Sequence, residues 1–91
     1  MKILWSGVFI AESSDVFMEG SDVYFPYDSV DKDFLQKSKV VFYCADKGYA
    51  DQYDFFVQGS VLVHAAWIYP HPYADAARYK GRVGFKKHLL Q

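Results

Sequence analysis

The residues best suited to nucleophilic chemistry are a single cysteine, Cys44, and the histidine at position 64. A reactive thiolate needs a neighbouring base, so His64 could activate Cys44 while Lys47, across a turn, stabilises the negative charge. Cys44, however, ends an apolar run, where a free cysteine usually packs as a small hydrophobic side chain. We therefore favour a non-catalytic protein and keep an enzyme using Cys44 or His64 as an alternative.

Metal binding is not expected, because it requires several His, Cys or carboxylate ligands that converge. Cys44, His64, His71 and His88 are spread along the chain without the spacing of a ligand set. No glycine-rich loop opens a helix in the manner of a phosphate or dinucleotide motif. The sequence thus predicts neither a metal nor a cofactor.

Length and composition describe the domain that must hold these residues. The 91 residues suit one domain, 1–91, and the 20% of aromatic residues provide large side chains for its core. The formal charge of −1 lacks the basic excess of a nucleic-acid binder. We interpret the basic residues near the C-terminus as a solvated strand end, with a phosphate or acidic-ligand contact as the less favoured alternative. They are Lys80, Arg82, Lys86, Lys87 and His88.

The expected location is the cytoplasm. With one cysteine the chain cannot form an internal disulfide, and Met1 to Glu12 has no charged region followed by a long apolar stretch and a cleavage site. The apolar run from Val61 to Tyr69 is far shorter than the roughly 20 residues that span a bilayer. No membrane partner is expected.

The N-terminal third is predicted to form two hairpins. In each, short β-prone runs flank turn residues, Ser6-Gly7 in the first and Glu19 to Asp22 in the second. The expected strands are Lys2 to Trp5, Val8 to Ala11, Val16 to Met18 and Val23 to Phe25.

A change of pattern then predicts a short helix at about Val30 to Lys37. Acidic residues lie at its start and basic residues at its end, and Val30 and Phe34 share one helical face. The continuous apolar run Val40 to Cys44 predicts a central strand, followed by a turn in which Gly48 takes a positive φ.

The next hairpin should join Tyr53 to Gln58 with Val61 to Tyr69, with Gly59-Ser60 as its two-residue type II′ loop. This loop would place Phe55 opposite His64. We interpret His64 as a core histidine, with a role in a pocket as the alternative. The face expected to point inward carries Tyr53, Phe55, Val57, Leu62, His64 and Ala66.

Pro70-His71-Pro72 should end that strand, because proline cannot donate to a β-ladder. A second short helix is expected over Tyr73 to Lys80, before Gly81, and a last strand over Arg82 to Phe85. The predicted fold class is mainly β (α+β), a compact antiparallel β domain of hairpins with two short helices.

Two motifs follow one another in the middle of the chain. Cys44 to Tyr53 reads Cys-Ala-Asp-Lys-Gly-Tyr-Ala-Asp-Gln-Tyr, and Ala65 to Pro72 reads Ala-Ala-Trp-Ile-Tyr-Pro-His-Pro. Tyr24-Phe25-Pro26 precedes them and Gly81-Arg82-Val83-Gly84-Phe85 follows. In these residues the chain resembles a bacterial and fungal family catalogued as domain of unknown function 427. The resemblance implies a compact β-rich domain.

The resemblance also implies where a site would lie, with aromatic rings stacking on a flat ligand and Lys47 or Arg82 meeting an anionic group. The resulting hypothesis is a domain that binds a small aromatic or anionic molecule near the turn between Cys44 and Tyr53. A second alternative is a structural or interaction module that self-associates as a homo-oligomer, in which the same residues serve only turns and core. The candidate ligand-binding residues are Cys44, Lys47, Tyr49, Tyr53, His64, Trp67, Tyr69 and Arg82.

Overall fold

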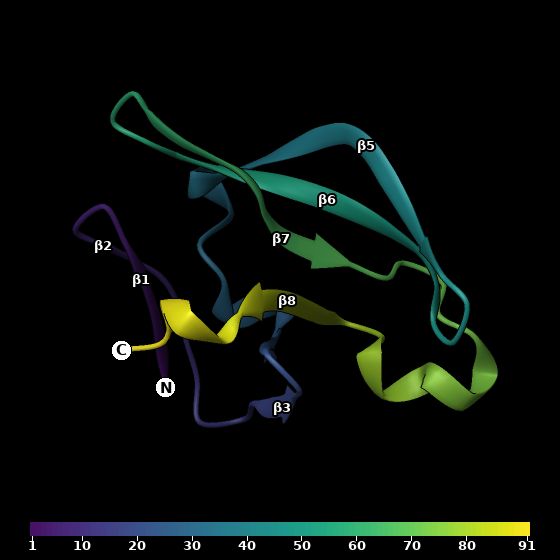
Figure 1. The fold of residues 1–91 in the computed structure, drawn as a ribbon. Coiled ribbons are helices and arrows are strands. Elements are labelled where there is room, and N and C mark those ends of the chain that lie inside the picture. Colours follow the sequence, from purple (N-terminus) through teal and green to yellow (C-terminus); the bar gives the residue numbers. More distant parts are fainter.

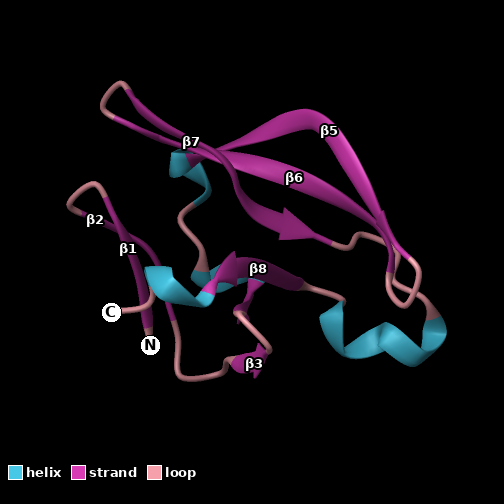
Figure 2. Ribbon diagram, in the orientation of Figure 1, coloured by secondary structure: helices cyan, strands magenta, loops and turns pink.

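The computed structural model describes residues 1–91 and consists of two antiparallel sheets (Figures 1 and 2). A two-stranded sheet pairs β1 (Lys2–Trp5) with β2 (Val8–Glu12). The second sheet has six strands in the order β3-β4-β8-β7-β6-β5. Its strands are β3 (Phe17–Glu19), β4 (Asp22–Pro26), β5 (Leu35–Cys44), β6 (Gly48–Val57), β7 (Ser60–Ile68) and β8 (Arg82–Lys86).

The predicted fold class is confirmed, as are the two N-terminal hairpins. Strand pairs β1-β2 and β3-β4 form where β-prone runs flank turn residues, with boundaries shifted by at most one residue. The strand Arg82–Lys86 is also present and lies between β4 and β7. None of the helices is long and apolar enough to cross a membrane.

The helix predicted over Val30 to Lys37 is wrong. The 3₁₀ turn η1 (Tyr27–Ser29) precedes this segment, only the 3₁₀ turn η2 (Lys32–Phe34) forms within it, and β5 begins at Leu35. Asp31 accepts a hydrogen bond from the Asp33 N–H at 3.1 Å, which closes a tight turn in place of a helical one. Val30 is 4% exposed and bridges to Ala11, so tertiary pairing outweighs the local helical signals.

The apolar run Val40 to Cys44 is a strand, but it lies at the edge of the sheet rather than at its centre. Val40, Val41 and Tyr43 are 45%, 50% and 54% exposed. A continuous apolar run is typical of a strand covered on both faces. Here β5 has a partner strand on one edge only, and these three side chains are exposed. The following turn behaves as predicted, with Gly48 at φ +103°.

The hairpin of β6 and β7 is present, but its loop is one residue earlier than predicted. Gln58 and Gly59 take φ of +48° and +84°, and Val57 pairs with Ser60. Two successive positive φ values are typical of a type I′ turn rather than the predicted type II′ turn. Phe55 therefore pairs with Leu62 instead of His64.

A bulge in β7 restores the predicted register further along the hairpin. Between the pairs Phe55–Leu62 and Tyr53–Ala66, the register shifts around His64, which takes φ +53°. The His64 N–H donates to Asp54 Oδ1 at 2.8 Å and holds this conformation. His64 is exposed, so the prediction of a core histidine is wrong, because a bulge re-aims the side chain that it contains.

The second predicted helix forms only as η3 (Ala74–Tyr79), a 3₁₀ helix interrupted at Ala76 by φ −113° and ψ 24°. Ala76 is buried while Ala77 is exposed. Another 3₁₀ turn, η4 (Lys87–Leu89), follows β8. The second predicted helix is therefore shorter and tighter than expected.

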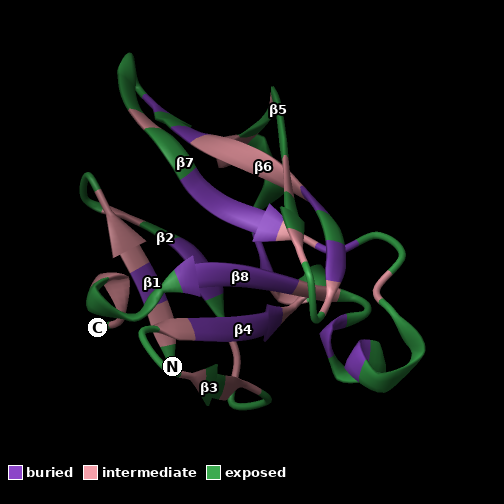
Figure 3. Ribbon diagram, turned by 45° about the vertical axis from the view of Figure 1, so that its right-hand side comes forward, coloured by how far each residue is buried: buried purple, intermediate pink, exposed green.

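The six-stranded sheet carries apolar side chains on both faces. On one face, Phe55, Phe85 and Phe25 pack against Ile3 and Ile10 of the small sheet. Figure 3 shows the buried stretches of β4, β7 and β8 side by side. The opposite face carries a second cluster, which we call the aromatic cluster, formed by Tyr24, Ala50, Trp67, Tyr69, Ala76 and Tyr79.

Candidate functional site

A pocket of about 370 Å³ opens beside the aromatic cluster, and we call it the aromatic pocket. This volume lies within the range of about 300 to 1,000 Å³ that is common for small-molecule sites. Aromatic rings and polar side chains from several strands converge on it. Its lining residues are Asp22, Phe42, Gln52, His64, Trp67, Tyr69 and Lys86.

The wall formed by Trp67 is fixed by its neighbours. Trp67 pairs with Gly84 across β7 and β8, and an added Cβ on Gly84 would lie 2.4 Å from the indole Nε1. Absence of a side chain at Gly84 therefore makes room for the ring. The indole N–H donates to the Tyr24 hydroxyl at 3.1 Å, which uses its one polar group within the protein.

Gln52, in the pocket lining, has a side-chain oxygen without a hydrogen-bond partner. Its Oε1 is buried and has no hydrogen-bond partner. An unpaired buried acceptor costs about 1 to 3 kcal/mol. Gln52 stands opposite Trp67 in the β6–β7 ladder and lines the same pocket.

Charged groups border the pocket on the β4–β8 side. Lys86 Nζ lies 3.2 Å from Asp22 Oδ1 and 5.4 Å from the centroid of the Trp67 ring. Burial raises the pKa of the Tyr69 hydroxyl well above 10, so this group stays protonated at neutral pH and can donate a hydrogen bond. The pocket lining thus contains aromatic rings, a donor hydroxyl, an ammonium group paired with a carboxylate, and Gln52, whose buried oxygen has no partner.

Lys47, predicted to meet an anionic ligand, instead makes contacts within the protein. Its Nζ lies 3.0 Å from Glu19 Oε1 and 4.9 Å from the centroid of the Tyr79 ring. The Tyr79 hydroxyl donates a hydrogen bond to Glu19. Glu19, Lys47 and Tyr79 therefore form a network that joins β3, the turn before β6 and η3.

The network shifts the pKa values of its members in directions that stabilise the charged pair. The hydrogen bond from Tyr79, aided by the charge of Lys47, lowers the pKa of Glu19 below 4.5 despite partial burial. Burial alone would lower the pKa of Lys47, but the hydrogen bond and charge of Glu19 outweigh it and raise that pKa above 10.5. Burial and the Glu19 hydrogen bond raise the pKa of Tyr79.

Replacing Glu19 by glutamine should lower the free energy of unfolding by about 1 kcal/mol at neutral pH, because a partly exposed ion pair and one charged hydrogen bond are weakened. The pKa of Glu19 is lower in the folded state, so its contribution is present above 4.5 and is lost as pH falls through the folded-state value. The measurement is urea denaturation of both proteins from neutral to acidic pH.

The difference between wild type and Glu19→Gln should shrink on acidification. Glu12→Gln is the matched control, since Glu12 faces Lys2 at 3.8 Å on an exposed surface and should change stability little. A constant difference across the pH range would mean that the Glu19 carboxylate does not carry the effect.

The other predicted site residues are distributed over the molecule. Tyr49 is 64% exposed and lies 5.0 Å from the Tyr43 ring. Arg82 forms an ion pair with Asp15 at 3.1 Å. Tyr53 packs against the core cluster of the opposite face.

Cys44 packs against the aromatic cluster and makes no hydrogen bond with His64. Of the eight predicted residues, the structure brings His64, Trp67 and Tyr69 together at the aromatic pocket. No group of three or more His, Cys, Asp and Glu side chains is placed to hold a metal ion.

Sequence reasoning missed Phe42, Gln52 and Asp22, and it considered Lys86 only among the basic residues near the C-terminus. One signal was available, because the register predicted from Tyr53 and Ala66 already places Gln52 opposite Trp67. The Asp22–Lys86 pair depends on the β4–β8 ladder. That ladder joins distant parts of the chain and has no local sequence signal.

Comparison with protein families identifies the family of this chain. A family model described as Domain of unknown function (DUF427) matches residues 1–91. No curated protein matches the chain.

Proposed function

This chain belongs to the family described as Domain of unknown function (DUF427), and we propose that it is a non-catalytic domain that binds a small molecule with a flat ring in the aromatic pocket. The observation that carries this proposal is the unpaired buried Oε1 of Gln52 in the lining of a pocket walled by aromatic side chains. A ligand that donates a hydrogen bond to this oxygen would remove the cost of leaving it unpaired.

The rings determine the shape of ligand that fits. Phe42, Trp67 and Tyr69 line the pocket, and flat rings pack against aromatic side chains in stacked or edge-to-face arrangements worth about 0.5 to 1.5 kcal/mol each. Lys86 and the Tyr69 hydroxyl supply donors for an acceptor or anionic group on the same ligand. An aromatic metabolite with both a donor and an acceptor satisfies all of these groups.

The aromatic pocket is a different place from the turn between Cys44 and Tyr53, where the sequence predicted the site. In that turn the ammonium group of Lys47 is held by Glu19 at 3.0 Å and is mostly covered. His64, in contrast, is exposed, lines the pocket and is held there by a backbone bulge. Bulges of this kind often aim a side chain at a site.

Gln52→Leu should separate ligand binding from structure, because its two expected effects have opposite signs. Removing the unpaired oxygen should raise the free energy of unfolding of the free protein by about 1 kcal/mol, while ligand affinity falls by about tenfold, equivalent to one lost hydrogen bond. The measurements are urea denaturation without ligand and thermal shift with a panel of aromatic amino acids, nucleosides, indole and benzoate.

Gln36→Leu is the matched control, since Gln36 is an exposed glutamine on the edge strand β5. It should leave the affinity of any bound compound unchanged. A compound that binds wild type and Gln52→Leu equally well would place the ligand elsewhere. The absence of a thermal shift with every aromatic compound would argue against the binding function itself.

Self-association is the second candidate function, and the edge strand favours it. β5 has ten residues and exposes Val40, Val41 and Tyr43 beside an unpaired row of backbone groups, a surface on which another copy can pair. Sedimentation over a wide concentration range tests this directly. A monomer at every concentration would exclude it.

The catalytic alternative has less support, because no hydrogen bond joins Cys44 to His64 and only His64 lines the pocket. We further propose a cytoplasmic location, in keeping with the free thiol of Cys44, and no nucleic-acid partner, in keeping with the net charge of −1.

A further inference from the structure

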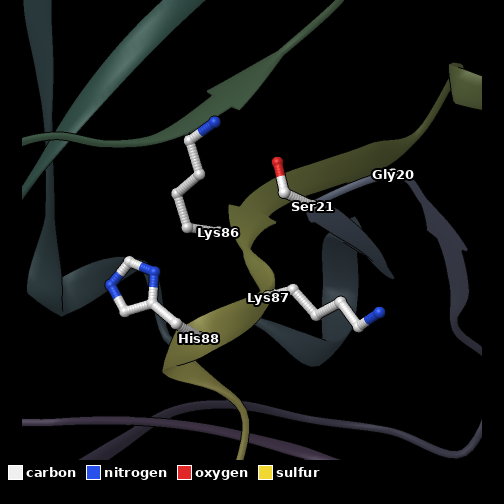
Figure 4. Close-up of a pocket in the computed structure, with 5 residues that line it drawn as sticks. All are labelled: Gly20, Ser21, Lys86, Lys87 and His88. Atoms are coloured by element: carbon white, nitrogen blue, oxygen red, sulfur yellow. The ribbon is translucent and has the colours of Figure 1, made fainter.

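A second hollow, of about 810 Å³, lies where the β3–β4 turn meets the end of β8 (Figure 4). We call it the basic strand end. The Lys87 N–H donates to the Ser21 carbonyl oxygen at 2.8 Å, which fixes the turn against the strand. The lining residues are Gly20, Ser21, Lys86, Lys87 and His88.

The charge of this surface is one-sided. No carboxylate and no apolar side chain lines it, although it contains two lysines and a histidine. Lys86 is paired with Asp22, whereas Lys87 and His88 have no ion-pair partner. Lys87 is therefore an uncompensated cation at this surface and is available to an anion.

The polar side chains leave the strand end in different directions. In Figure 4 the side chains of Lys86 and Ser21 extend to the same side of the strand end, His88 lies beside Lys86, and Lys87 extends from the other side of the backbone. The Ser21 hydroxyl makes no hydrogen bond within the protein and can donate one. A tetrahedral oxyanion has oxygens pointing in several directions and can accept from more than one of these donors.

Lys86 also lines the aromatic pocket, so the two hollows adjoin each other. We propose that the basic strand end is a phosphate subsite, and that the ligand of the aromatic pocket is a small aromatic metabolite carrying a phosphate group. The phosphate would contact Lys86 and Ser21, with Lys87 and His88 at the border of the subsite (Figure 4). The ligand class rests on the function proposed above, whereas phosphate binding at this surface can be tested alone.

The first experiment is a titration of the ¹⁵N-labelled protein with inorganic phosphate at low ionic strength, followed by amide chemical shifts. The expected result is saturable shifts concentrated at the five lining residues, with affinity reduced about tenfold in the double variant Lys87→Gln/His88→Gln. Lys39→Gln is the matched control, because Lys39 is an exposed lysine on β5 outside both hollows. It should bind phosphate as wild type does.

Shifts spread over all exposed lysines, or equal affinity in the double variant and wild type, would overturn the phosphate subsite. Binding of an aromatic compound is compared in parallel with and without its phosphate, using adenosine with AMP and tyrosine with phosphotyrosine. If neither member of either pair binds while inorganic phosphate does, the ligand class proposed for the pocket is wrong and the subsite stands. If both members bind equally and inorganic phosphate does not bind, the aromatic pocket stands and the subsite is wrong.

Discussion

Replacing Gly84 by alanine should lower the free energy of unfolding by about 1 to 3 kcal/mol, the usual cost of adding a group to a filled space. The new Cβ would lie 2.4 Å from Nε1 and 2.5 Å from Cε2 of Trp67. Either the indole or the β8 backbone must then move. Movement of the indole would also break its 3.1 Å hydrogen bond to the Tyr24 hydroxyl.

The same change should weaken ligand binding, because Trp67 forms a wall of the aromatic pocket. Urea denaturation measures the stability, and tryptophan fluorescence in a Trp5→Phe background reports on Trp67 alone. The control is Trp67→Phe, whose smaller ring leaves space for the added methyl group. In a double-mutant cycle Gly84→Ala should therefore cost less in the presence of Trp67→Phe. Equal costs in both backgrounds would show that contact with the indole is not the cause.

The parts of the fold that sequence predicts well are those set by neighbouring residues. Gly7, Gly20 and Gly48 all take positive φ, a conformation that glycine adopts without the steric cost of a Cβ. Turns at these positions bring the flanking β-prone runs together as hairpins. The existence of the strands follows from short-range chemistry, so one sequence is enough to find them.

The predicted helix at Val30 to Lys37 fails because its signals are also short-range, while the competing interactions are not. Leu35 pairs with Phe55 in the β5–β6 ladder, and Val30 bridges to Ala11. Helix propensity differs among ordinary residues by only about 0.7 kcal/mol per position. Burial of a single large apolar side chain contributes about 1.5 to 3 kcal/mol, so sheet pairing prevails.

The candidate site depends on both short-range sequence signals and long-range contacts. The pairing of Gln52 with Trp67 follows from the predicted register. The position of His64 does not, because it depends on a type I′ turn at Gln58-Gly59 and a compensating bulge. A shift of one residue in a loop moves every side chain beyond it to the other face, until the bulge corrects the register.

Phe85→Ala should lower the free energy of unfolding even more, by about 3 to 5 kcal/mol. The cost has two parts, the lost transfer free energy of the buried ring and the cavity that it leaves. Phe85 is 0% exposed and lies 5.6 Å from the Phe25 ring and 6.1 Å from the Phe55 ring. Native domains have free energies of unfolding of about 5 to 15 kcal/mol, so the variant should keep only part of the stability of the wild type. Urea denaturation measures the change.

Phe9→Ala is the matched control, since Phe9 is 51% exposed, and it should cost less than about 1 kcal/mol. A loss for Phe85→Ala as small as that of the control would contradict the position of β8 within the sheet. Phe85 and Gly84 are adjacent but face opposite sides of the sheet. Any Phe85→Ala molecules that remain folded should therefore bind the pocket ligand with unchanged affinity, whereas Gly84→Ala should lose both stability and affinity, because only Gly84 contacts a pocket wall.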